Sequence, residues 1–184
     1  MAAPIRDKAH SEITRWLESV VIGQNLCPFA KHPYLNETVE IVISLEQDFE
    51  ALIEVFATEL ERLEQYDAKV LETTLLVLPN ATPLFEDYLD LLALANEFVV
   101  LKGWEGRYQI ASFHPLYQFD GTDSDSRENY TNRAPYPVLH LLREESVSKA
   151  VDSHPDVDSI PERNIEWLNA LSDDDFKRLF FPEK

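Results

Sequence analysis

The stretch Thr38–Leu78, TVEIVISLEQDFEALIEVFATELERLEQYDAKVLETTLLVL, holds the pattern that decides the fold. It begins with a β-branched run and ends with a nearly continuous apolar run, and both are typical of strands. Between them, Asp48–Tyr66 repeats apolar residues at helical spacing, with glutamates mostly on the other face. A strand, a helix and a second strand in this order predict a right-handed crossover between parallel neighbours.

The same alternation continues on both sides of this stretch. Pro83 opens a helix that ends near Gly103, and Tyr108–Phe113 has the composition of a third strand. Further helices are predicted for Pro4–Ile22, from Pro137 to about Val151 and from Pro161 to about Leu171, followed by a short amphipathic segment at 172–184.

These elements predict an α/β or α+β fold. We expect a single compact domain over residues 1–184, with its core at about 10–171. A short sheet of roughly three to four strands, built on a β-α-β-α-β core, is covered by the N-terminal and C-terminal helices. An antiparallel partner strand, which would give a ferredoxin-like arrangement, stays open.

Composition narrows the class of protein. The chain has 184 residues, of which 45% are apolar, so it can fill one hydrophobic core. No run approaches the roughly 20 apolar residues of a membrane span, so no membrane association is expected. A formal net charge of −18 argues against nucleic acid as a partner. The single cysteine excludes an internal disulfide framework and favours the cytoplasm.

Chemistry-bearing side chains gather in Ser112–Glu144, SFHPLYQFDGTDSDSRENYTNRAPYPVLHLLRE. Residues 102–143 are neutral overall, whereas residues 37–101 carry −13. The connection Pro115–Pro135 exceeds the about 12–15 residues above which an unstructured loop is usually functional or disordered. It also follows the carboxyl end of a strand, where ligands bind in open α/β sheets. We therefore expect a ligand-facing loop here.

Eight residues are candidates for the site. His114 and His140 would act as general acid and base, because histidine titrates near neutral pH, and Cys27 is an optional nucleophile. His140 is expected in the first turn of a helix, sharing a face with Arg143. Arg133 would orient an anion. The remaining ligand-binding candidates beside it are Asn129, Asn132, Tyr117 and Arg143.

Each of these candidates also has a structural interpretation. Arg133 and Arg143 would pair with Glu144 or Glu145, asparagines often bond their own backbone in turns, and a free cysteine is usually a small buried apolar group. A metal site from His32, His114, His140, Cys27 and a carboxylate lacks any diagnostic spacing. Only four glycines occur, and none forms a phosphate-binding motif, so the cofactor stays unknown.

Several motifs, and the order in which they occur along the chain, closely resemble those of a known family. They are VIGQNLCPFA at Val21–Ala30, ETTLLV at Glu72–Val77, ASFHPLYQF at Ala111–Phe119, NYTNRAPYPVLHLLREESV at Asn129–Val147 and PERNI at Pro161–Ile165. They resemble the bacterial, uncharacterised domain-of-unknown-function family 1415, from about Trp16 to Leu171. Gln24 and Ala134 are minor departures, where Leu and Ser would be expected. The resemblance implies a single bacterial cytoplasmic domain and brings no activity with it.

Two functional hypotheses follow. The first is an enzyme that acts on a small anionic metabolite, with histidine as general acid and base and Arg133 binding the anion. The alternative is a ligand-binding or protein-interaction module that uses the same pocket without chemistry. A loop with a purely structural role is the third interpretation. The oligomeric state is not set by any of these patterns.

Overall fold

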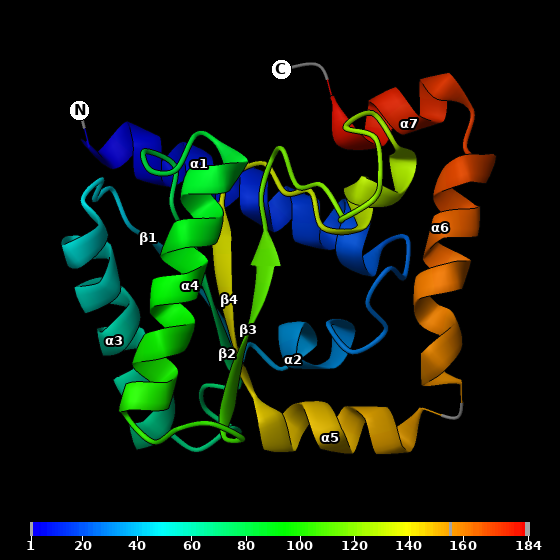
Figure 1. Cartoon of the computed structure of the whole chain (residues 1–184). Coiled ribbons are helices and arrows are strands. Elements are labelled where there is room, and N and C mark those ends of the chain that lie inside the picture. Colours follow the sequence, from blue (N-terminus) through cyan, green and yellow to red (C-terminus); the bar gives the residue numbers. More distant parts are fainter. Residues whose placement is uncertain (1, 155, 183–184) are drawn as a thin grey trace.

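The structure, a computed structural model describing residues 2–154 and 156–182, alternates strands and helices through its first two thirds (Figure 1). The strands are β1 (Val39–Ile43), β2 (Thr73–Val77), β3 (Tyr108–Phe113) and β4 (Val138–Arg143). The α-helices are α1 (Ala2–Trp16), α2 (Lys31–Leu35), α3 (Phe49–Gln65), α4 (Phe85–Leu101), α5 (Glu144–Ser153), α6 (Ile160–Ala170) and α7 (Asp173–Phe180). A π-helical segment η1 (Leu17–Ile22) continues α1, and the 3₁₀ turns are η2 (Arg127–Thr131) and η3 (Val157–Ser159).

The four strands form one mixed sheet with the order β1-β2-β4-β3. β1 and β2 are parallel neighbours, as the crossover through α3 predicts. β4 lies between β2 and β3 and runs antiparallel to both. β4 is thus an antiparallel partner strand of the kind that the sequence left open, and it separates β3 from β2. The single-domain α/β class, with helices covering a short sheet, is confirmed.

The helix expected from Pro137 to about Val151 is wrong in its first half. Val138–Arg143 is the central strand β4, and only Glu144–Ser153 is helical. VLHLLR is a short, mostly apolar run, and its hydrophobic pattern alone does not separate a buried strand from a buried helix. Its place between β2 and β3 supplies ladder hydrogen bonds on both sides, which local helical propensity does not outweigh.

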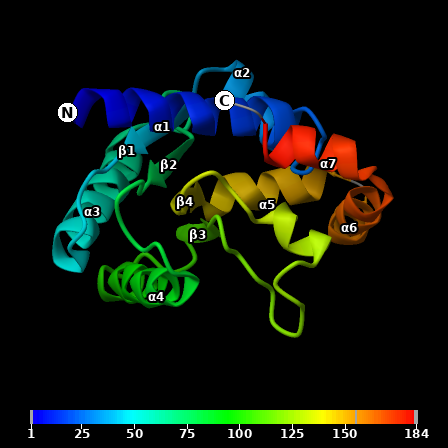
Figure 2. The ribbon, with the colours of Figure 1, turned by 90° about the horizontal axis from the view of Figure 1, so that it is seen from above.

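Each face of the sheet buries its own hydrophobic cluster. Figure 2 shows α3 and α4 on one side of the strands, and α1, α5 and α6 on the other. Phe56, Leu60 and Tyr88 pack beneath α3 and α4 on the first face. On the second face, Ile13 and Trp16 from α1 pack with other apolar side chains on the strands. We call these the α4 face and the α1 face.

The first connection approaches the α1 face through a crowded turn at Gly23. A Cβ atom at this position would lie 2.6 Å from Glu18 O and 2.7 Å from Ser19 O, so only glycine fits behind the widened turn of η1. The chain then passes through Asn25, whose φ of 55° is left-handed, and reaches Leu26 and Cys27 beside the core. In the described part of the chain, no helix combines the length and apolarity that crossing a bilayer requires.

Candidate functional site

Asn129 holds the long connection after β3 together from inside. Its side chain is fully buried. The Oδ1 atom accepts hydrogen bonds from Phe119 N–H and from the Thr122 hydroxyl, each at 2.9 Å, and Nδ2 donates to Asp123 O at 2.8 Å. All of these partners belong to the same connection. Asn129 therefore shapes the loop, and both of its amide atoms are used within it.

Arg133 fastens the same loop. Its Nε donates to Tyr117 O at 3.0 Å and its Nη2 donates to Ser124 O at 2.6 Å. The guanidinium carbon lies 4.5 Å from the centre of the Tyr130 ring, within range of a cation–π interaction. The fork expected to bind an anion is thus directed at backbone carbonyls. Tyr117 packs its ring between those of Phe85 and Phe119, with both centroid distances at 5.0 Å.

His114 is fully buried on the α4 face. Its Nε2 donates to Thr82 O at 2.9 Å, and its Nδ1 accepts from Leu116 N–H at 3.0 Å. These two bonds require the neutral ring with the proton on Nε2. Burial lowers the pKa of His114, which also favours the neutral form. Its ring packs against those of Phe85 and Tyr88, so no face of it opens to a ligand.

His140 lies on the α1 face, in the middle of β4, and not in the first turn of a helix. Its Nε2 is 2.8 Å from the Thr73 hydroxyl oxygen, which itself lies 2.6 Å from Leu141 O. Because the hydroxyl proton is needed by that carbonyl, His140 Nε2–H is the donor to Thr73. Burial lowers the pKa of His140 to about 4. The two histidines therefore lie on opposite faces of the sheet and share no pocket.

Arg143 ends β4 on the α4 face, where it serves the end of α3. Its Nη2 lies 2.5 Å from Leu63 O, 2.7 Å from Tyr66 O and 3.0 Å from Leu71 O. Leu63 lies in the last turn of α3 and Tyr66 directly follows the helix. Backbone acceptors at a helix end lack helical partners, and a cation is favoured there. Within the described residues, Arg143 Nε is buried without a hydrogen-bond partner. Neither Glu144 nor Glu145 pairs with this guanidinium among the described salt bridges.

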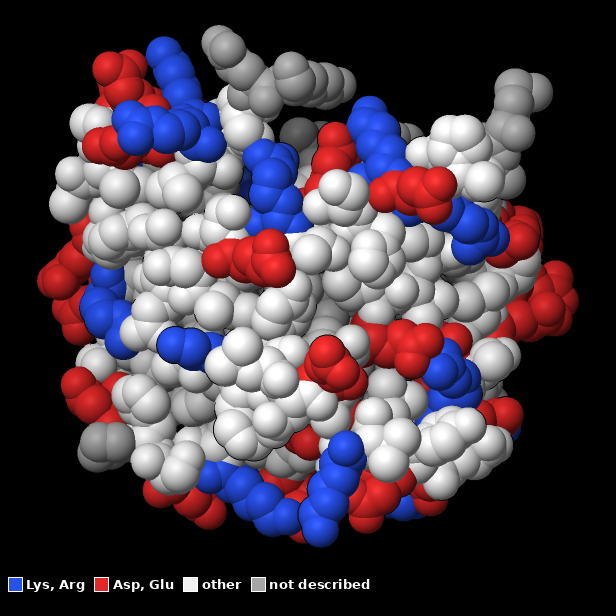
Figure 3. Space-filling view, turned by 180° about the vertical axis from the view of Figure 1, so that it is seen from behind, with Lys and Arg blue, Asp and Glu red and all other residues white. Residues whose placement is uncertain are grey.

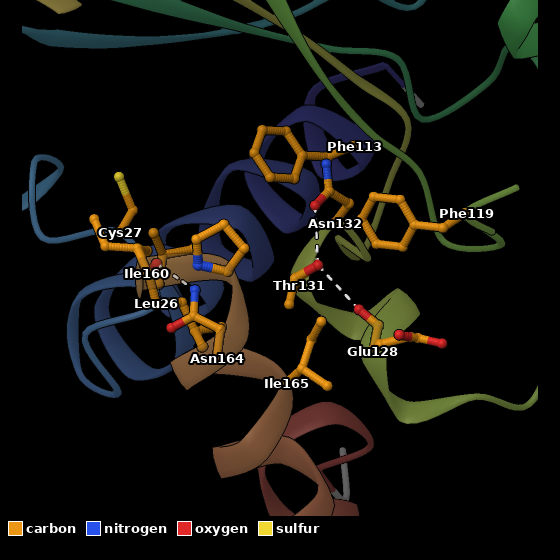
Figure 4. A pocket seen from close by; sticks show the side chains of 12 residues that line it. Leu26, Cys27, Phe113, Phe119, Glu128, Thr131, Asn132, Ile160, Asn164 and Ile165 are labelled. Atoms are coloured by element: carbon orange, nitrogen blue, oxygen red, sulfur yellow. Dashed lines mark hydrogen bonds between the residues drawn. The ribbon is translucent and has the colours of Figure 1, made fainter. Parts of the chain in front are cut away.

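A groove opens on the α1 face, between the first connection, the end of β3, η2 and α6 (Figure 4). Its volume is about 450 Å³. In Figure 4, Phe113 and Phe119 face Leu26 and Ile160 across the groove. We call it the Phe113 groove; its lining residues are Val21, Leu26, Cys27, Phe113, Phe119, Glu128, Thr131, Asn132, Ile160, Pro161, Asn164 and Ile165.

Polar side chains in α6 tie it to the first connection and so form one wall of the groove. Asn164 Nδ2 donates to Leu26 O at 2.7 Å, and Arg163 Nη2 donates to Asn25 O at 2.9 Å. Asn164 is almost completely buried. Two residues of PERNI (Pro161–Ile165) therefore fix α6 against the first connection. The sequence candidates for the site do not include this segment, although PERNI is one of the motifs that resemble the family.

The opposite wall is η2, which contacts with the end of α6 and with α7 hold in place. Arg127 donates to Leu168 O at 3.2 Å and Leu171 O at 2.6 Å, and pairs with Asp173 at 2.5 Å. Tyr130 packs against the Phe176 ring of α7 at 4.7 Å. The amphipathic C-terminal segment is thus helical and packs against η2.

Two of the predicted site residues line the groove. Asn132 donates from Nδ2 to Ser112 O at 3.1 Å, while its Oδ1 accepts from the Thr131 hydroxyl at 3.1 Å. Cys27 is half-buried, and burial raises the pKa of its thiol, so the neutral form dominates. Its sulfur points away from Phe113 and Asn132 (Figure 4).

The charge on the side chains that line the groove does not suit an anion. Glu128 is the one charged side chain among the described lining residues, and no lysine or arginine accompanies it. Within residues 2–154 and 156–182, no three His, Cys, Asp or Glu side chains gather as a metal would require. The arrangement is suited to burying an apolar group, with a few hydrogen-bonding atoms at one side.

Fold and groove together define a mixed α/β domain with a ligand-sized, mainly apolar hollow beside its sheet. The protein family of unknown function DUF1415 matches residues 8–178, and the chain belongs to that family. No curated protein matches the chain, and no solved structure does so either.

Proposed function

We propose that this chain is a binding module for a small, uncharged and largely apolar molecule, which it holds in the Phe113 groove. The observation that carries the proposal is the groove itself. Its volume of about 450 Å³ falls within the range typical of small-molecule sites. Most of its lining is aliphatic or aromatic. Asn132 and Thr131 bond each other and the carbonyls of Ser112 and Glu128, and the second Nδ2 hydrogen of Asn132 and the lone pairs of the two oxygens would orient one end of a ligand.

The positions of the other candidate residues favour binding over catalysis. A general acid or base must lie within hydrogen-bond reach of its substrate. His114 has both ring nitrogens bonded to backbone, and His140 points its Nε2 at Thr73. Arg133 points its guanidinium at carbonyls of its own loop. This supports the ligand-binding alternative over an enzyme that acts on an anionic metabolite.

The charge of the surface also disfavours an anionic ligand. The chain carries a net charge of −18, which repels anions at long range. On the face shown in Figure 3, lysines and arginines are interspersed with aspartates and glutamates, and no broad basic field gathers there. A phosphate-rich partner such as nucleic acid needs such a field. We therefore propose a neutral small molecule as the partner, and the cytoplasm, where the free Cys27 thiol would stay reduced, as the location.

A fluorescent probe tests this proposal. The neutral dye N-phenyl-naphthylamine, which brightens in apolar surroundings, should bind the folded chain saturably. Ile165→Asp places a charge in the groove wall and should weaken binding by about tenfold or more, because a charge without a partner is costly in apolar surroundings. Glu162→Ala, on the same helix but outside the lining, is the matched control and should bind as the parent chain does.

The anionic relative of this dye, anilinonaphthalene sulfonate, separates the hypotheses. A groove without lysine or arginine should bind the neutral dye more tightly than the anion. If the anion binds more tightly and Arg133→Gln abolishes its binding, the anionic-metabolite hypothesis is favoured and our proposal fails. Dye binding that Ile165→Asp leaves unchanged would also contradict it, once circular dichroism shows that the variant is folded.

A further inference from the structure

β3 is an edge strand whose outer side exposes backbone groups. It pairs with β4 alone, in an unbroken antiparallel register. The bond from Glu144 N–H to Arg107 O, at 2.9 Å, fixes which residues face β4, because alternate residues of an antiparallel pair bond across it. By this alternation Gln109 and Ala111 point their amides at β4. Tyr108, Ile110 and Ser112 point theirs outward.

Two of these outward groups are already used within the chain. Tyr108 N–H donates to Trp104 O at 3.2 Å, and Ser112 O accepts from Asn132 Nδ2 at 3.1 Å. Four groups then remain: Tyr108 O, both backbone groups of Ile110, and Ser112 N–H. In the part of the chain that the structure describes, none of them has a hydrogen-bond partner.

The four remaining groups are complementary to themselves. If a second β3 lies antiparallel with the two-fold axis at Ile110, each Ile110 N–H meets the Ile110 O of the other copy. Each Ser112 N–H then meets the other Tyr108 O. The other bond of that same residue pair would join Tyr108 N–H to Ser112 O, and Trp104 and Asn132 already satisfy those two groups. Each Tyr108–Ser112 pair therefore forms one bond instead of two, and the Ile110 pair forms both.

α4 provides an apolar flank beside this edge. Phe85 contacts His114 and Tyr117, just after β3, whereas Phe98 contacts Phe56 of α3 at 6.1 Å. The β3 side of α4 therefore continues from Phe85 at helical spacing. It carries Leu89, Leu92, Ala93, Asn96 and Val100. Leu89 is 44% exposed and Val100 is 52% exposed.

The β3 side of α4 carries little charge, which favours contact between two copies of an acidic chain. Residues 37–101 carry a net −13, and two such surfaces repel each other. Asp87, Asp90 and Glu97 of α4 fall on its other sides, and only Glu86, in the first turn near His114, borders the β3 side. Natural edge strands are usually protected by a charged residue or a proline. YQIASF, the sequence of β3, contains neither.

We propose that β3 and the adjoining side of α4 form the interface of a homodimer, with a two-fold axis at Ile110. The sheets of both copies join into one, and α4 packs against α4 of the other copy on the same face. Each copy forms the Phe113 groove alone. The dimer proposal and the ligand proposal can therefore be tested independently.

Sedimentation velocity tests the dimer. The parent chain should sediment with twice the mass of one chain at micromolar concentration. Leu89→Lys and Val100→Lys each remove apolar contact and add like charges across the axis, so each should raise the dimer Kd by about tenfold or more. Leu94→Lys is the matched control, because Leu94 is 41% exposed on the other side of α4. It should leave the dimer unchanged.

A cross-linking experiment tests the register. In a Cys27→Ser background, Gln109 of one copy faces Ala111 of the other as a non-hydrogen-bonded pair, whose Cα atoms lie about 4.5 Å apart, within disulfide range. A mixture of Gln109→Cys and Ala111→Cys chains should therefore cross-link under mild oxidation, and each variant alone should do so poorly.

Two outcomes overturn the proposal. The first is a parent chain that stays monomeric throughout the micromolar range; an extended peptide partner would then be the better occupant of the edge. The second is a dimer that resists both lysine variants and whose mixed cysteine chains do not cross-link. Such a dimer would use another face.

Discussion

His114 Nε2 donates to the carbonyl of Thr82 at 2.9 Å and so joins the end of β3 to the turn before α4. Thr82 has a φ of 48°, which is rare for a β-branched residue and costs about 1–3 kcal/mol. Its hydroxyl is buried without a partner among the described residues. The histidine thus stabilises a strained turn, and its two ring nitrogens serve the backbone.

His114→Ala should lower the free energy of unfolding by about 3 kcal/mol. The substitution leaves buried Thr82 O and Leu116 N–H without their partners and opens a cavity beside Tyr88. Urea unfolding followed by circular dichroism measures the loss. His32→Ala is the control, because His32 is exposed, and it should change stability by less than about 0.5 kcal/mol. A folded His114→Ala chain of parental stability would contradict a structural role.

His140 should make stability depend on pH. Burial lowers its pKa from 6.5 to about 4, so between these values the unfolded chain binds more protons than the folded one. Stability therefore falls as the pH falls from 6.5 towards 4, by up to about 3 kcal/mol from this residue. His114, whose pKa burial also lowers, contributes in the same direction.

His140→Gln isolates that contribution. Glutamine does not titrate and keeps a donor for the Thr73 hydroxyl. The stability difference between parent and variant, measured by urea unfolding at several pH values, should shift in favour of the variant as the pH falls. A difference that is constant between pH 7 and about 4 would show that the folded His140 protonates normally.

Arg143→Met should destabilise the chain by about 2–3 kcal/mol, because the carbonyls of Leu63, Tyr66 and Leu71 lose a charged donor at the end of α3. Thermal or urea unfolding measures the change. Arg178→Met removes an exposed pair with Asp175 and should have almost no effect. Equal effects of the two substitutions would contradict the capping role of Arg143.

Cys27 should react slowly with iodoacetamide at neutral pH. Burial raises the pKa of its thiol, so the thiolate fraction is smaller than that of an ordinary cysteine and the rate should keep rising above the ordinary thiol pKa. The urea-unfolded chain serves as the reference and should react faster at every neutral pH. Faster alkylation of the folded chain would indicate an activated nucleophile and would support the catalytic hypothesis for Cys27.

In the connection after β3, polar side chains that are typical of ligand sites stabilise the loop itself. Ser112–Glu144 was expected to face a ligand because it is rich in histidine, arginine and asparagine. In the fold, Asn129 and Arg133 bond the backbone of the connection that contains them. A long loop must satisfy its own buried polar groups, and the side chains able to do so are the types that also bind ligands. Composition does not separate the two uses.

Strong local periodicity was sufficient to predict α3, α4, β1, β2 and β3, together with the parallel pairing of β1 and β2. The remaining features depend on contacts between distant segments. β4 is a strand because the gap between β2 and β3 supplies hydrogen bonds on both sides. The Phe113 groove exists because Asn164 binds Leu26 O across 138 residues of chain. Contacts of this kind depend on where distant segments meet, which no local periodicity records.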